Sequence, residues 1–158
     1  LGQDFADNFG GTLLRGTTII DISRTPTLVL HGDTLCTDDV EYQKMRTLFH
    51  DPKWLADILS KPLEERKTFA QSLRDTSRRE SANKPANIVD VNEETVVQSM
   101  RSANVSLMIH GHTHRPARHY NAEGERIVLG DWGQSGWCVR AQDGDISLES
   151  FPLWPGAF

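Results

Sequence analysis

The sequence has only two cysteines and no long hydrophobic run, and both absences narrow the class of protein. Cys36 and Cys138 are far apart and neither belongs to a CxxC pair, so reduced structural thiols and a cytosolic setting are expected. No apolar run approaches the roughly 20 residues that cross a bilayer. Residues 1–20 also lack the basic start and apolar block typical of a secretory signal.

The composition is that of an ordinary globular domain. Of 158 residues, 37% are hydrophobic and 25% charged, which is enough for one domain with a core. The net charge of −5 argues against a nucleic-acid partner. The chain starts at Leu1 without Met, so we expect a processed protein or a piece of a longer one.

Strand-like and helix-like segments alternate in three blocks. Residues 12–22 and 27–30 are rich in β-branched and apolar residues and predict short strands. From Asp38 to about Asn104, Asp and Pro residues mark four helix starts, at Asp38 or Asp39, Pro52, Pro62 and Asn92. Four short strands are expected afterwards, at 105–109, 126–129, 137–140 and 146–151. This order predicts an α/β fold with a helical insertion at residues 40–103.

Three of the six histidines stand within five positions, in the segment His110-Gly111-His112-Thr113-His114. The segment follows the predicted strand 105–109. Gly111 permits a sharp turn there, and Pro116 prevents a following helix. Because neutral imidazole is the commonest protein ligand for transition metals, this pattern favours a metal site.

Two other predicted strands also end in polar residues, at His31-Gly32-Asp33 and Gly130-Asp131-Trp132. Sites in α/β sheets gather at the carboxyl ends of strands, so we expect His31, His112 and His114 to meet. They would hold one Zn²⁺ with a water molecule, or form the nitrogen half of a two-metal site whose bridging carboxylate lies elsewhere. His110 is expected to point away by strand alternation. His50 and His119 are expected at the surface.

The segments Leu30–Asp39 (LHGDTLCTDD) and Ile109–Pro116 (IHGHTHRP) together resemble the calcineurin-like metallophosphoesterases. Asp90-Val91-Asn92 and 128–132 fit the same resemblance, which covers essentially the whole chain. It implies part of a four-layer α/β/β/α sandwich with a helical lid. The family's early DxH, GD and GN motifs, which supply further metal ligands, are missing before His31. The chain therefore resembles the C-terminal two-thirds of a single phosphoesterase domain.

The resemblance also implies an activity and a set of site residues. Two Mn²⁺ ions would activate water to attack the α-phosphorus of a UDP-linked diacylated glucosamine, giving UMP and the diacylglucosamine 1-phosphate of lipid A biosynthesis. The implied metal ligands are His31, His112 and His114, and His112 also has a catalytic role beside the substrate. The implied substrate-binding residues are Asp39, Ser77, Ser81, Lys84 and His112. The 158 residues alone are expected to be inactive and to bind metal weakly.

The segment 61–84 carries seven basic and four acidic residues in an acidic chain. A basic, partly amphipathic helix can lie at an anionic membrane surface or simply face water. The resemblance favours the first, with peripheral association at the cytoplasmic face of a bacterial inner membrane. The candidate acyl or membrane contacts are Trp54, Leu55, Ile58, Phe69 and Leu73. The alternative functions are a phosphodiesterase for soluble nucleotides and a non-catalytic interaction module.

Overall fold

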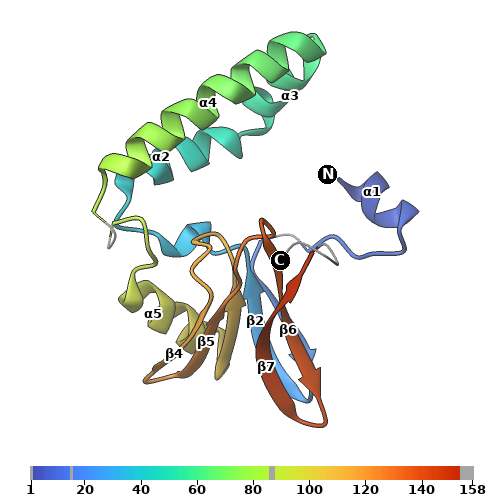
Figure 1. The fold of residues 1–158 in the computed structure, drawn as a ribbon, viewed down its shortest axis with the longest axis vertical. Coiled ribbons are helices and arrows are strands. Elements are labelled where there is room, and N and C mark those ends of the chain that lie inside the picture. The colour runs from blue at the N-terminus through green and yellow to red at the C-terminus, as the bar shows by residue number, and fades with distance from the viewer. Residues whose placement is uncertain (1, 15, 86–87, 154–158) are drawn as a thin grey trace. The chain divides into compact units, whose positions relative to one another are not determined.

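The computed structural model describes residues 2–14, 16–85 and 88–153, and the chain divides into two units (Figure 1). The sheet unit combines the residues up to Asp33 with those from Glu93 onward. The helical unit is Thr34–Asn92. The last predicted helix, which the sequence grouped with residues 40–103, therefore falls in the sheet unit.

A mixed five-stranded sheet forms the centre of the sheet unit, in the strand order β1-β2-β3-β5-β4. Strands β2, β3 and β5 are parallel to one another, and β1 and β4 pair antiparallel at the two edges. The elements of this sheet are β1 (Thr18–Ile22), β2 (Thr25–Leu30), β3 (Leu107–His110), β4 (Ala117–Asn121) and β5 (Gly124–Val128). Strands β6 (Ser135–Gln142) and β7 (Asp145–Pro152) form a separate antiparallel pair, and the unit also contains helices α1 (Gln3–Asn8) and α5 (Glu93–Ala103).

Both faces of the five-stranded sheet carry buried apolar residues, because side chains alternate along each strand. On one face Leu107, Ile109 and Ile127 form a core cluster. The partly buried residues packed against that cluster include Val139, Ile146 and Leu148 of β6 and β7. On the other face, Arg126 of β5 and Asn121 of β4 reach Glu93 and Met100 of α5. The sheet is therefore covered by the β6–β7 pair on one side and by α5 on the other, which confirms a mixed α/β fold.

Three elements differ from the sequence-based prediction. The first strand begins at Thr18 rather than near residue 12, and Ser23 and Arg24, both at positive φ (51° and 67°), make the turn into β2. Strand β4 and helix α1 were not predicted. Strand β4 has the polar sequence ARHYN at a sheet edge, so it carries little of the hydrophobic signal that identifies a strand.

The helical unit contains α2 (Val40–Phe49), α3 (Pro52–Ser60) and α4 (Leu63–Asn83), after a short 3₁₀ turn at Asp33–Leu35. The predicted start signals at Asp39 and Pro52 are confirmed. The Asp39 carboxylate accepts the Tyr42 N–H at 3.1 Å, and Asp51 accepts two N–H groups just before Pro52. Such N-terminal caps satisfy backbone donors that have no partner inside the helix.

Aromatic contacts join the three helices of this unit. The Trp54 ring lies 5.1 Å from that of Phe49 and 6.1 Å from that of Phe69, measured between ring centroids. Helices α2 and α3 contain no fully buried residue. None of the described helices is both long and apolar enough to span a membrane.

Candidate functional site

The carboxyl ends of β2, β3 and β5 lie at one edge of the sheet, as predicted from the three strand-end motifs. Leu30 pairs with His110, and His110 pairs with Val128, in the parallel register. The segments beginning at His31, Gly111 and Leu129 therefore leave the sheet side by side. Two backbone hydrogen bonds join them, from Gly111 N–H to the His31 carbonyl (3.0 Å) and from Leu129 N–H to the His110 carbonyl (2.8 Å).

Two of the predicted metal ligands meet at this edge. His31 Nε2 and His112 Nδ1 lie 3.3 Å apart although 81 positions separate them, and the two rings stand edge to face with centroids 5.0 Å apart. Two imidazole nitrogens that bind one tetrahedral ion at about 2.0–2.1 Å are themselves roughly 3.3 Å apart. The two rings therefore have the spacing of two ligands of one metal ion. In the structure described here, a hydrogen bond joins the two rings.

The backbone of the histidine segment is bent in an uncommon way. His112 and His114 both have positive φ (65° and 53°), and Thr113 N–H donates to the Gly111 carbonyl at 2.8 Å. Positive φ is uncommon for residues other than glycine and is concentrated at functional sites. His114 is exposed. Within the described residues, no group of three or more His, Cys, Asp or Glu side chains is arranged to hold a metal ion, so His114 as a third ligand stays a prediction.

His110 lies beneath the site, outside the predicted ligand set. Its side chain is 1% exposed. Its Nδ1 is 2.9 Å from the Gly111 carbonyl oxygen, and its Nε2 is 3.2 Å from Nη1 of Arg126. Arg126 is itself 4% exposed and its Nη2 lies 3.5 Å from a carboxylate oxygen of Glu93. Sequence reasoning assigned no role to Arg126 or Glu93; a charged residue inside the apolar strand 126–129 was the available signal.

Of the predicted substrate-binding residues, His112 belongs to the sheet unit and the other four belong to the helical unit. Lys84 Nζ donates to both carboxylate oxygens of Asp39, at 2.7 and 2.9 Å. The Asp39 side chain is only 10% exposed and that of Lys84 23%, so the structure joins two residues that lie 45 positions apart. Ser77 is exposed on α4. Ser81 also belongs to α4, but its side chain is outside the described part of the chain.

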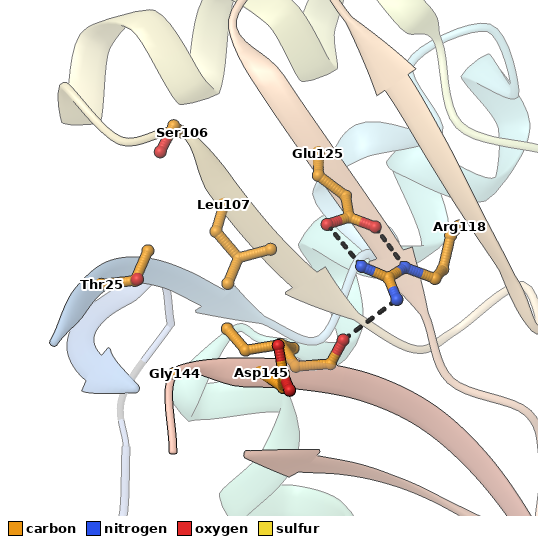
Figure 2. A pocket seen from close by; sticks show the side chains of 8 residues that line it. Thr25, Ser106, Leu107, Arg118, Glu125, Gly144 and Asp145 are labelled. Carbon is orange, nitrogen blue, oxygen red and sulfur yellow. Dashed lines mark hydrogen bonds and ion pairs between the residues drawn. The ribbon is translucent and has the colours of Figure 1, made fainter. Parts of the chain in front are cut away.

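A cavity of about 510 Å³ lies at the opposite end of the sheet from the histidines. Its lining includes Thr25 and Leu107, the first residues of β2 and β3, and the ion pair of Arg118 and Glu125 (Figure 2). The Arg118 guanidinium donates to both carboxylate oxygens of Glu125, and its third nitrogen donates to the Ile146 carbonyl at 3.0 Å. Arg118 thereby fastens the start of β7 to the sheet.

The same ion pair shifts the protonation of both partners. The hydrogen bonds from Arg118 lower the pKa of the Glu125 carboxyl below its usual value of 4.5, and Glu125 raises the pKa of Arg118. The two directions agree, because each charge stabilises the other. This cavity is therefore lined by a neutralised ion pair and carries none of the predicted site residues.

Comparison with known proteins identifies relatives over nearly the whole chain, although no protein-family model matches it. The chain is 44% identical over 158 residues to a UDP-2,3-diacylglucosamine hydrolase of Marinobacter nauticus, and 42% identical over 157 residues to one of Cellvibrio japonicus. Each alignment covers 97% of this chain and 65% of the relative. A third, from Chromohalobacter salexigens, is 45% identical over 90% of this chain and 60% of its own length.

A search of solved structures found vacuolar protein sorting 29 of Cryptosporidium parvum, with a TM-score of 0.38 and 9% identity over 89% of this chain and 58% of that protein. That likeness is too slight to support an argument about the site. The sequence matches are much stronger, since their identity is 42–44% and they extend through both histidine motifs. The chain is therefore similar over nearly its whole length to proteins named UDP-2,3-diacylglucosamine hydrolase, and it spans about 65% of the length of the first of these relatives.

Proposed function

We propose that this protein hydrolyses the pyrophosphate bond of UDP-2,3-diacylglucosamine to UMP and 2,3-diacylglucosamine 1-phosphate. The observation that carries the proposal is the His31–His112 pair, 3.3 Å apart at the carboxyl edge of the sheet, in a chain whose relatives bear that enzyme's name. Two imidazoles meeting from separate strand ends suit a metal-dependent hydrolase. A complete four-layer phosphoesterase sandwich would add one more layer to the helix layer and the two sheets described above.

Mn²⁺ is the proposed cofactor, with two ions in the complete site. His31, His112 and His114 would supply the nitrogen ligands, and carboxylates from outside these 158 residues would supply the others. When bound, the ions would lower the pKa of the attacking water and neutralise charge on the phosphoryl oxygens. His112 would lie beside the substrate, with its ring held next to His31 by the bent backbone of its segment.

The head group of the substrate would be bound by Asp39, Ser77, Ser81 and Lys84. Lys84 has three N–H donors, and two of them are given to Asp39. The remaining donor and its positive charge suit a phosphate oxygen. Asp39 also caps α2, so the lysine is oriented by a side chain that is itself fixed to a helix terminus.

Contact with a membrane is the second part of the proposal, at the cytoplasmic face of the bacterial inner membrane. Among its described residues, the helical unit exposes six large apolar side chains, namely Val40, Met45, Leu48, Leu55, Leu59 and Leu63, in addition to its basic segment 61–84. Of the predicted acyl contacts, Leu55 is exposed, whereas Trp54, Ile58, Phe69 and Leu73 are half-buried. Exposed apolar residues beside basic ones favour peripheral binding to anionic lipid.

The decisive experiment uses the longer protein in which these 158 residues are joined to the proposed carboxylate ligands, supplies it with Mn²⁺ and UDP-2,3-diacylglucosamine, and measures the release of UMP. We expect His114→Ala to abolish release, because it removes a proposed ligand, and His50→Ala, an exposed histidine of the helical unit, to have no effect. Unchanged turnover by His114→Ala would contradict the metal assignment. Activity on soluble nucleotides alone would identify a different phosphodiesterase, and Mn²⁺ binding without turnover of either substrate would favour an interaction module.

A further inference from the structure

The side chain of His110 contacts two of the strand-end segments. Gly32, which follows His31, has φ +111°, and a Cβ atom placed on it would lie 2.7 Å from His110 Nδ1. The His110 ring also reaches the Gly111 carbonyl in its own segment. His110 therefore contacts both segments that carry the paired imidazoles of His31 and His112.

The partners of the two ring nitrogens determine the tautomer of His110. A carbonyl oxygen only accepts hydrogen bonds and a guanidinium only donates them. Nδ1 must therefore carry the proton that it donates to Gly111 O, and Nε2 must accept from Arg126 Nη1. The neutral Nδ1–H tautomer satisfies both contacts, whereas the Nε2–H tautomer satisfies neither.

Burying the charged side chain of Arg126 at this position is unfavourable in free energy. It is 4% exposed, its one carboxylate contact to Glu93 is long at 3.5 Å, and its Nε is buried with no hydrogen-bond partner in the described part of the structure. Replacing a buried charged group by an apolar one is often neutral or stabilising. The shorter polar contact of Arg126 is the one to His110 Nε2, at 3.2 Å.

The Gly111 carbonyl connects His110 to the candidate site. It accepts hydrogen bonds from His110 Nδ1 at 2.9 Å and from Thr113 N–H at 2.8 Å. Two donors on one oxygen fix the plane of the peptide between Gly111 and His112. The next residue, His112, has φ 65°, a conformation that persists only where surrounding contacts impose it.

We propose that His110 is a positioning residue: its Nδ1–H, kept in that tautomer by Arg126, orients the Gly111 carbonyl and so holds the His112 ring beside His31. The inference rests on the proposed function only in that it takes His112 to be a metal ligand. Groups that orient ligands in this way typically change metal affinity by about 10–100-fold when they are removed.

Two substitutions separate the two contacts of His110. The amide nitrogen of Asn can take the place of Nδ1 and keep the donor to Gly111, whereas the amide of Gln reaches toward Nε2 and leaves Gly111 without it. We expect His110→Asn to bind Mn²⁺ within about threefold of the original affinity, and His110→Gln to bind about 10–100-fold more weakly. His50→Gln is the control and should bind as the unchanged protein does. Equal affinities for the Asn and Gln variants would overturn the proposal.

A second measurement needs no metal. In ¹⁵N NMR spectra of the histidine rings of the unchanged protein, His110 should show the neutral Nδ1–H tautomer, and an Nε2–H tautomer or an imidazolium would refute the inference. The His112 resonances should move in His110→Gln and stay in His110→Asn. If the unchanged protein binds no Mn²⁺, the proposed metal site fails, and these resonances alone decide whether His110 positions His112.

Discussion

Replacing Gly32 by alanine should strongly destabilise the sheet unit. The Cβ atom would lie 2.7 Å from His110 Nδ1, closer than real Cβ atoms approach, and 3.1 Å from the Gly111 carbonyl oxygen, which is a tight contact. The residue also has φ +111°, which side chains rarely adopt. The substitution therefore combines steric overlap with backbone strain.

The two contributions can be estimated separately. Strained backbone at a residue other than glycine costs about 1–3 kcal/mol. Overpacking of a close-packed region costs a further 1–3 kcal/mol or so, because His110 is buried and held at both ring nitrogens. The sum is on the order of 2–6 kcal/mol. At about 2–4 °C per kcal/mol for a chain of this size, the midpoint of thermal unfolding should fall by roughly 5–20 °C.

Two other glycines provide matched controls for urea and thermal unfolding followed by circular dichroism. Gly10 has φ +65° with nothing within 4 Å of an added Cβ, and Gly111 would meet only the His31 carbonyl at 3.8 Å. Gly10→Ala should therefore show the backbone cost alone, about 1–2 kcal/mol, and Gly111→Ala almost none. If Gly32→Ala were no less stable than Gly10→Ala, the close approach of Gly32 to His110 would not exist in solution.

Two further predictions concern contacts away from the histidines. Because Arg118 lowers the pKa of Glu125, the ion pair stabilises the fold above the ordinary carboxyl pKa, and this contribution should be lost as the pH falls through the lowered value. In unfolding measured from pH 7 to pH 3, Glu125→Gln should be less stable than the unchanged protein at pH 7 and should lose less stability on acidification. Identical pH profiles of the two proteins would contradict the assignment. Asp51→Ala should reduce the free energy of unfolding of the helical unit by about 1 kcal/mol, because Asp51 accepts hydrogen bonds from the N–H groups of Lys53 and Trp54 at 2.9 and 2.8 Å. Asp57→Ala on the same helix is the control. Equal losses of stability in the two variants would show that capping is not the cause.

The sequence predicted the elements that have strong local signals. The structure confirms the elements that begin at the cap Asp39 and at Pro52, and those formed by the apolar runs before His31 and His110. The start of the first strand was misplaced, because the predicted strand region began near residue 12 and β1 begins at Thr18. Strand β4 was missed because a polar edge strand is recognised only through its partner, β5.

The approach of His31 to His112 was predicted from a general property of parallel strands, whereas the buried contacts of His110 next to them were not. The contacts of His110 with Arg126 and of Arg126 with Glu93 join three elements separated in sequence. Nothing local to Glu93 distinguishes it from the acidic residues that commonly begin helices. Such contacts depend on the register of β3 against β5, which a single sequence does not specify.

The pairing of β2 with β3 also has a consequence for how the protein folds. Residues 27–30 pair with residues 107–110, so the whole helical unit lies within the loop that this contact closes. Helices form in about a microsecond or less, whereas parallel strands distant in sequence pair slowly, because closing a long loop is entropically costly. The His31–His112 contact should therefore be among the last to form, and metal binding during refolding would report the arrival of the completed sheet rather than the collapse of the chain.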